Sequence, residues 1–464
     1  MSRLAPRGCL ALALGAVACG SSTEPDPPAP EGPPDIMLLL VAGLRADPHD
    51  APGVATRFLD AIEGSPAWSS QNTYAQSPST KLSMASLLTG HYPSAIPLCG
   101  AATRELKGPQ PWCTQLPTDR RSLPDILALY GYETAFYHTP FRDSEQLAAR
   151  FGSSECFTQR DPKQRQQALI EASHRWWTAR ADTPRLLVTL FTDAMLLPLE
   201  LGWPPASMEW EFAVDSHNAP SPAPLAREEL IGAFDASFDQ LAQSAAALER
   251  TLEPSPARER LLLVASLHGL SLMETGDLQG FSGAAPVMSD IVLDRTVRVP
   301  MALFLDGEGT AVVTEQPLEL LDVLPTVLHQ AGSTPLADAP GRNLPREWAS
   351  DDPRAAAYAE FGDMLALRHG PHLLGFRAML HNATPLNDDL DHILELPVTP
   401  AYRLHDVTQD PWQQHDLSQT MPQRAKELHQ LMLEMRRGAA APALDEITPE
   451  QMLELKLTAS QGYW

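Results

Sequence analysis

Short apolar runs alternate with longer amphipathic segments over most of this chain. The apolar runs predict buried strands at 35–41, 133–138, 185–191, 260–267 and 299–305. Apolar positions at helical spacing predict helices at 83–90, 122–131, 161–180, 229–252 and 318–332. Strands that alternate with helices are typical of a mostly parallel, doubly wound α/β sheet.

The pattern changes after about residue 350, where shorter and more polar runs begin. They predict a small antiparallel unit with strands within 355–361, 364–380 and 401–408, followed by helices at 422–437 and from Thr448 onward. We therefore expect a main domain over 35–350 and a small C-terminal α+β subdomain over 351–464.

The first residues predict export. Arg3 and Arg7 precede "CLALALGAVAC", which is too short to span a bilayer but fits a signal peptide over 1–18. The run ends in a sequence that resembles a bacterial lipobox, with Cys19 as the lipidated residue and a Pro-rich tether over 19–34. We expect a bacterial cell-envelope protein that a lipid holds to the membrane, at the outer membrane or the periplasmic face. Ordinary secretion is the alternative.

The net charge bears on the class of partner, and the cysteines bear on a possible disulfide. The net charge is -24 and no long basic run occurs, so we expect no nucleic-acid partner. In an oxidising compartment Cys99 and Cys113 could close a local loop and leave Cys156 free, although the sequence does not choose the pairing.

A loop dense in Ser and Thr runs into a helix at 75–93, "AQSPSTKLSMASLLTGHYP". Hydroxyls and unpaired backbone N–H groups at a helix N-terminus suit an anion site or an activated hydroxyl. The alternative is a plain helix cap, which is the more common use of such residues.

The order of several motifs makes the chain resemble one family. "IMLLLVAGLRAD", "TKLSMASLLTGHYP", "SLPDILALYGYETAF", "LLLVASLHGLSLMETG", "RVPMALFLDGEG", "LLDVLPTVLHQAG" and "GRNL" follow one another as they do in the sulfatase family of the alkaline-phosphatase superfamily. "LHDVTQDPWQQHDLS" near the end continues the resemblance. It implies an α/β sandwich with a mostly parallel central sheet and a small C-terminal α+β subdomain.

The resemblance also implies a catalytic pattern. The family holds a divalent cation with carboxylates at the tip of the first strand and with an Asp after a later strand. Its nucleophile begins a motif ahead of "LTG", and this position falls on Thr80. Ser83 matches a motif serine, whereas Met84 replaces an arginine. Because threonine cannot become formylglycine, the resemblance excludes sulfatase chemistry by that route.

The metal positions have lost their acids. Ala42 and Gly43 occupy the positions of the first-strand ligands, and Leu267 replaces the later aspartate, with His268 retained beside it. Mg²⁺ and Ca²⁺ require several hard oxygen ligands. No ligand set is intact, so we expect no cofactor.

Other acids in the chain are poor candidates to replace these metal ligands. Asp193 and Asp294 could approach the site, although nothing in their spacing requires it, and Asp47 is expected to be structural.

Three hypotheses remain. The first is a non-catalytic or altered descendant that binds an unknown ligand or envelope partner. The second is an active phosphate- or sulfate-ester hydrolase or transferase with Thr80 as nucleophile. Only this hypothesis requires a divalent cation, Ca²⁺ or Mg²⁺, in an unorthodox site. The third and weakest is a purely structural envelope lipoprotein.

Overall fold

The computed structural model describes most of the segment between residues 32 and 438. The described residues are 32–47, 53–62, 66–96, 121–141, 144–194, 227–253, 258–270, 292–305, 312–314, 316–333, 336, 338–344, 354–361, 364–380 and 399–438. The predictions that concern Cys19, Cys99, Cys113, the domain boundary at 350 and the helix from Thr448 lie outside these residues. Within the described part, no helix is both long enough and apolar enough to cross a bilayer.

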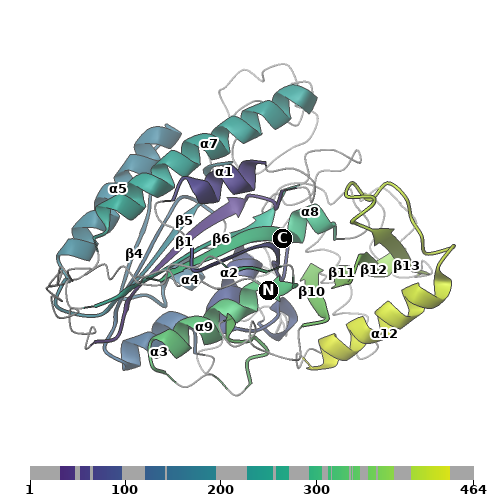
Figure 1. Cartoon of the computed structure of the whole chain (residues 1–464). Helices are drawn as coiled ribbons and strands as arrows, with labels where there is room; N and C mark the ends of the chain where they lie inside the picture. The colour runs from purple at the N-terminus through teal and green to yellow at the C-terminus, as the bar shows by residue number, and fades with distance from the viewer. Residues whose placement is uncertain are drawn as a thin grey trace, which may run out of the picture.

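A large sheet forms the centre of the molecule (Figure 1). Its strands follow the order β4-β3-β5-β1-β6-β7-β2-β8, and β9 also pairs with β2. All pairs are parallel except those that β7 makes with β6 and β2. The strands are β1 (Asp35–Gly43), β2 (Trp68–Tyr74), β3 (Glu133–His138), β4 (Ser153–Cys156), β5 (Arg185–Phe191), β6 (Arg260–Gly269), β7 (Arg298–Leu305), β8 (Val312–Val313) and β9 (Leu318–Glu319).

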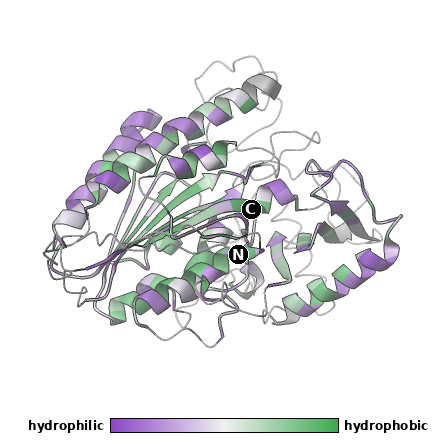
Figure 2. Cartoon of the chain, viewed as in Figure 1, coloured by the Kyte–Doolittle hydropathy of each residue, from purple (hydrophilic) through white to green (hydrophobic). Residues whose placement is uncertain are grey.

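Helices cover both faces of this sheet, as Figure 2 shows with apolar strands inside and polar helix surfaces outside. On β1, the even-numbered residues of 36–42 join the core under one layer of helices, and the odd-numbered residues of 37–41 join the core under the other. The first layer holds α2 (Thr80–Thr89), α3 (Leu123–Leu129) and α9 (Val323–Gln330), and the second holds α1 (Val54–Asp60), α5 (Pro162–Thr178) and α7 (Arg227–Thr251).

Short helices join several of these elements. They are η1 (Pro93–Ala95), α4 (Glu145–Ala148), α8 (Asp294–Val297) and η3 (Leu320–Asp322).

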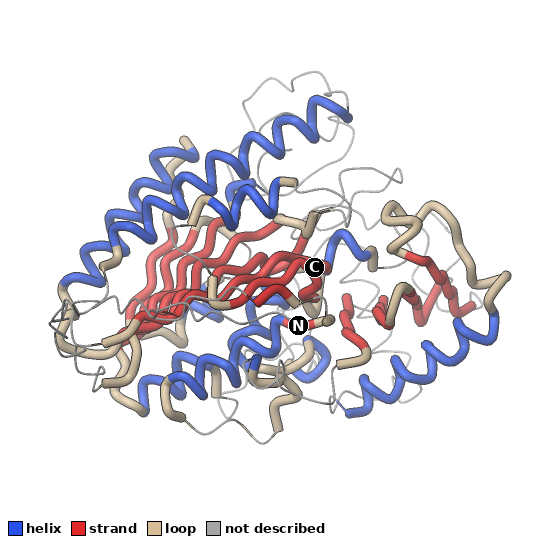
Figure 3. Tube along the Cα trace, viewed as in Figure 1, coloured by secondary structure: helices blue, strands red, loops and turns tan. Residues whose placement is uncertain are grey.

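A second sheet lies beside the first and is antiparallel (Figure 3). It consists of β10 (Ala356–Phe361), β11 (Met364–His369), β12 (His372–Leu380) and β13 (Thr399–Asp406). One face packs on α12 (Pro422–Gly438). The other face packs on the main domain, where Tyr74, Val292 and Val297 join its core.

The structure confirms the predicted fold class, with a large, mostly parallel sheet and a small antiparallel one. The predicted strands are present, but the pattern missed β2, β4 and the two-residue strands β8 and β9. The sequence of β2, "WSSQNTY", is too polar for the pattern to predict a buried strand. The strand nevertheless lies between β7 and β8 and is largely buried. The helix expected from residue 318 begins at Leu320 as the short helix η3, which Glu319 and Asp322 start with a capping box, and continues from Val323 as α9.

Candidate functional site

The carboxyl ends of β1 and β6 lie side by side at one edge of the large sheet. Their parallel register pairs Gly43 with Gly269, after an irregularity that begins at Val41. Helix α2 packs against β6 and begins at Thr80. Parallel sheets bind ligands at this edge, so the strand order places the predicted site residues where the fold can use them.

Thr80 and His268 meet directly at this edge. Thr80 Oγ1 lies 2.9 Å from His268 Nε2, and His268 Nδ1 lies 2.9 Å from the carbonyl oxygen of Gly269. Because a carbonyl oxygen can only accept, the proton of the neutral ring resides on Nδ1. His268 Nε2 therefore accepts the hydrogen bond that the Thr80 hydroxyl donates.

Burial determines how basic this imidazole is. His268 and Thr80 are both fully buried. Loss of hydration lowers the pKa of His268 to about 4, so the ring is neutral near pH 7. A base with so low a pKa withdraws a hydroxyl proton only weakly, and Thr80 remains a neutral alcohol.

Ser83 does not join this pair. Its hydroxyl donates to the carbonyl oxygen of Ser77 at 2.6 Å, and it accepts from the Ser77 N–H at 3.2 Å. These bonds fix the loop that precedes α2. The structure thus brings together two of the three predicted catalytic residues and gives the third a structural contact.

Three positions at which the resemblance implies polar residues belong to the hydrophobic core. Ala42, Met84 and Leu267 are fully buried members of one apolar cluster. Gly43 has φ 93°, in a region where a side chain is strained. An acid at that position would need a different backbone conformation as well as a different residue.

The nearby acid Asp47 stabilises a helix. Its Oδ1 accepts from the Ala55 N–H at 2.9 Å, and its Oδ2 accepts from the N–H and hydroxyl of Thr56 at 2.8 and 2.6 Å. These groups belong to the first turn of α1, so Asp47 acts as a cap from outside the helix. The geometry agrees with the structural role expected for it.

Asp193 and Asp294 each form an ion pair with a buried arginine. Asp193 Oδ1 accepts from Arg165 Nε at 2.7 Å, and burial raises the pKa of this carboxyl. Asp294 Oδ2 accepts from Arg298 Nε at 2.8 Å, while its Oδ1 accepts from the Tyr74 hydroxyl at 3.1 Å. Neither acid contacts Thr80 or His268.

The residues present do not fit the divalent cation that the fold implies. Its ligand positions carry Ala42, Gly43 and Leu267, which offer no side-chain oxygen. Across the described segments, no three His, Cys, Asp or Glu side chains are grouped in a way that could hold a metal ion. No step that requires such an ion follows from this geometry.

Sequence reasoning missed a threonine contact at the next strand tips. Thr139 follows β3 and Thr192 follows β5, and their hydroxyl oxygens lie 2.9 Å apart. The Thr192 N–H also donates to Thr139 Oγ1 at 2.7 Å. The only sequence signal is that each residue directly follows a predicted strand. These bonds tie the ends of β3 and β5 together.

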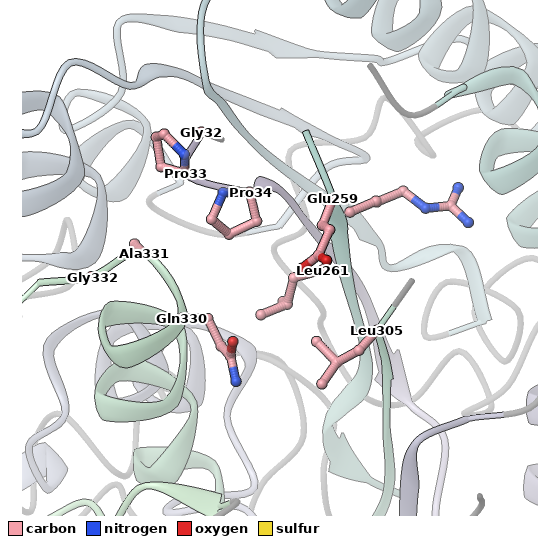
Figure 4. A pocket seen from close by; sticks show the side chains of 10 residues that line it. Gly32, Pro33, Pro34, Glu259, Leu261, Leu305, Gln330, Ala331 and Gly332 are labelled. Atoms are coloured by element: carbon pink, nitrogen blue, oxygen red, sulfur yellow. The ribbon is translucent and has the colours of Figure 1, made fainter. Parts of the chain in front are cut away.

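A shallow pocket of about 350 Å³ lies at the opposite edge of the large sheet (Figure 4). It is found where β1 and β6 begin, whereas Thr80 and His268 lie where β6 ends. Its lining includes Pro33, Pro34, Glu259, Leu305, Gln330 and Gly332. This pocket therefore has no part in the candidate site.

Solved structures share this architecture, and part of the chain matches a family model. A 2-O GAG sulfatase aligns with a TM-score of 0.60 over 88% of this chain and 93% of its own, at 14% identity. Residues 46–193 match the family model described as Sulfatase. The chain has a sulfatase fold.

Two further sulfatase-fold structures agree with this assignment. One is a protein in complex with its substrate D-glucosamine-2-N,6-O-disulfate, with a TM-score of 0.60, 14% identity and coverage of 90% of this chain and 100% of its own. Another comes from work on glycosaminoglycan metabolism by Bacteroides thetaiotaomicron, with a TM-score of 0.63, 13% identity and coverage of 89% and 98%. No curated protein sequence matches the chain. The resemblance to sulfatases predicted from the sequence agrees with the family-model match over residues 46–193 and with the fold of these structures.

Proposed function

We propose that this protein is a non-hydrolytic member of the sulfatase fold that binds a ligand or an envelope partner without turnover at the ancestral site. One observation carries the proposal: Ala42, Met84 and Leu267 form part of a continuous buried apolar cluster beside Thr80. Hydrolysis of a sulfate or phosphate ester needs charge stabilisation where these residues lie. An apolar cluster cannot supply it.

Metal content and ester turnover test this proposal. The purified mature protein is expected to contain far less than one metal ion per chain and to show no Thr80-dependent hydrolysis of aryl sulfates or aryl phosphates. Thr80→Ala removes the hydroxyl beside His268. Thr89→Ala is the matched control, because Thr89 lies on the same helix and donates to the Ala85 carbonyl oxygen. Stoichiometric metal together with turnover that only Thr80→Ala abolishes would overturn the proposal.

The hydrogen bond between Thr80 and His268 favours a second candidate function. A hydroxyl beside a base held by a third group is the arrangement of an activated nucleophile. The candidate is a phosphate- or sulfate-ester hydrolase or transferase that uses Thr80 and an unorthodox Ca²⁺ or Mg²⁺ site. Incubation with each metal, followed by the same assays, should restore Thr80-dependent turnover if this candidate is correct. The full burial and low pKa of His268 weigh against it.

The proposed location is the bacterial cell envelope, with the lipid of Cys19 as the membrane anchor. The signal-peptide pattern and the lipobox-like ending support it. Metabolic labelling with an alkynyl fatty acid should mark the native chain and not Cys19→Ser. Cys9→Ser is the matched control, because Cys9 lies in the segment that processing would remove. Equal labelling of both variants would contradict the anchor at Cys19.

A further inference from the structure

A buried arginine without a counter-ion lies in the joint between the small sheet and the main domain. Arg368 is 5% exposed, and its Nη1 has no hydrogen-bond partner. No described acid forms an ion pair with it. Isolated buried charge is costly, and a guanidinium group does not lose its proton in proteins. Among the described residues, none supplies an ion-pair partner for this charge.

The strand register shows where the side chain lies. Arg368 on β11 pairs with Ala357 on β10 and with Leu373 on β12. Both partners belong to the cluster in which the small sheet packs against Tyr74 of the main domain. Because paired residues of an antiparallel sheet share a face, Arg368 also lies on the face turned toward the main domain.

The charged groups that act on Tyr74 are two arginines, Arg298 and Arg368, and one acid, Asp294. Arg298 donates to Asp294 Oδ2 at 2.8 Å and to the carbonyl oxygens of Gln71 and Asp47, each at 3.2 Å. Asp294 receives its second hydrogen bond from Tyr74. The ion pair of Arg298 and Asp294 is therefore complete without Arg368. Burial raises the pKa of Tyr74, and the positive charge of Arg368 opposes that rise.

Two further unpartnered polar atoms border this joint. Gln413 has φ 53°, and its Oε1 accepts from the Asp294 N–H at 2.7 Å, so its Nε2 can only donate and has no partner. His405 is 2% exposed, its Nδ1 is also unpartnered, and it lies across Leu373 from Arg368. Buried polar groups in native proteins nearly always have partners.

We propose that Arg368 binds a small anion, a halide or a carboxylate the size of formate, in the joint between the two sheets, with Gln413 Nε2 as the second donor. The anion supplies the missing negative charge, which a water molecule cannot do. The neighbours Ala357 and Leu373 on this face are apolar and favour a small occupant. The site is separate from Thr80 and His268 and does not depend on the function proposed for them.

Thermal unfolding in increasing sodium chloride or sodium formate tests the site. A ligand that binds only the folded state raises the melting temperature, by about 3 °C at a hundred times its Kd for a chain of this length. Arg368→Met should remove this dependence, and Gln413→Met should weaken it. Arg403→Met is the matched control because Arg403 is exposed on β13 of the same sheet, so its loss should leave the dependence unchanged.

Bromide in crystals of the native protein gives a direct measurement. Anomalous density is expected within hydrogen-bond distance of Arg368 Nη1, and this readout remains valid even if a variant does not fold. Two results would overturn the proposal: the same anion dependence in Arg368→Met as in the native chain, or no bromide beside Arg368 at saturating concentration. A response to chloride alone or to formate alone would identify which anion the site takes.

Discussion

At the scale of the residue, His268 shows how burial controls chemistry. Its ring donates from Nδ1 to the Gly269 carbonyl oxygen and accepts the Thr80 hydroxyl at Nε2, and no described acid takes part. The lowered pKa keeps the ring neutral through the whole physiological range. The same pair in a solvated site with a nearby carboxylate would be a far stronger base.

This burial predicts a pH-dependent stability. The pKa of His268 is about 4 in the folded protein and about 6.5 in the unfolded chain, so the unfolded chain takes up the proton first as pH falls. His268 should therefore reduce the free energy of unfolding between pH 6.5 and 4, by up to roughly 3 kcal/mol. Chemical denaturation across this range should show a shallower decline in His268→Asn.

His329→Asn is the control for this comparison, because His329 is exposed on α9 and its loss should leave the decline unchanged. An identical pH profile for the native protein and His268→Asn would contradict the prediction.

Leu267 is the position at which the motif acid can be restored by one substitution. Leu267→Asp places a charge in a fully buried apolar cluster with no cation to pair with, so it should lower the free energy of unfolding by roughly 3–5 kcal/mol. Leu129→Asp, at an exposed position near the end of α3, should cost less than about 1 kcal/mol. Urea titration measures both. A Leu267→Asp variant that is stabilised by Mg²⁺ or Ca²⁺ would show instead that a metal site remains.

At the scale of the element, α1 depends on an acid outside its own sequence. The N-terminal residue of the helix is preceded by Gly53, which has no capping side chain, and Asp47 supplies the acceptors. This arrangement gives the acid just past the tip of β1 a structural role. Its role is to fix the helix that comes after the strand.

Asp47→Ala should loosen α1. Loss of the three hydrogen bonds should cost roughly 2 kcal/mol and speed amide hydrogen exchange over 54–60. Asp161→Ala is a milder comparison, because Asp161 caps α5 through a single bond of 2.9 Å to the Gln164 N–H and should cost about 1 kcal/mol. Exchange in α1 that does not change in Asp47→Ala would contradict the capping role.

At the scale of the whole molecule, buried ion pairs fasten the small sheet to the main domain. Arg354, just before β10, pairs with Glu319 and, at 2.6 Å, with Asp322. Within the small subdomain, Arg436 of α12 pairs with Glu360 of β10 at 2.7 Å, and Glu360 also accepts from the Ser94 N–H of the main domain. Breaking such a pair by removing one partner leaves a buried charge without compensation.

Arg354→Ala should therefore weaken the joint. The two acids it leaves unpaired should lower the free energy of unfolding by roughly 3–5 kcal/mol, and limited proteolysis should release the small sheet earlier than in the native chain. Arg57→Ala breaks a half-exposed pair with Asp239 at 3.0 Å and should change stability by less than about 1 kcal/mol. Equal effects of the two variants would contradict the special role of the buried pair.

Much of the fold can be predicted from local pattern. The apolar runs at 133–138 and 185–191 coincide with the observed strands, because strands buried on both faces need continuous apolar residues. β2 was not predictable in the same way, because its polar sequence lacks the apolar run of a buried strand and only its pairing with β7 and β8 identifies it. The candidate site was predictable as a set of motif positions, whereas its hydrogen bonds were not.

The sequence by itself determined the fold class, the motif order and the absence of acids at positions 42, 43 and 267, because these depend on residue type and spacing. Only the tertiary structure decided that Thr80 bonds to His268, that Ser83 does not, and that Ala42 and Leu267 share one apolar cluster. The physical reason is that these contacts join segments far apart in the chain. Their geometry, burial and pKa values arise only when the strands and helices pack together.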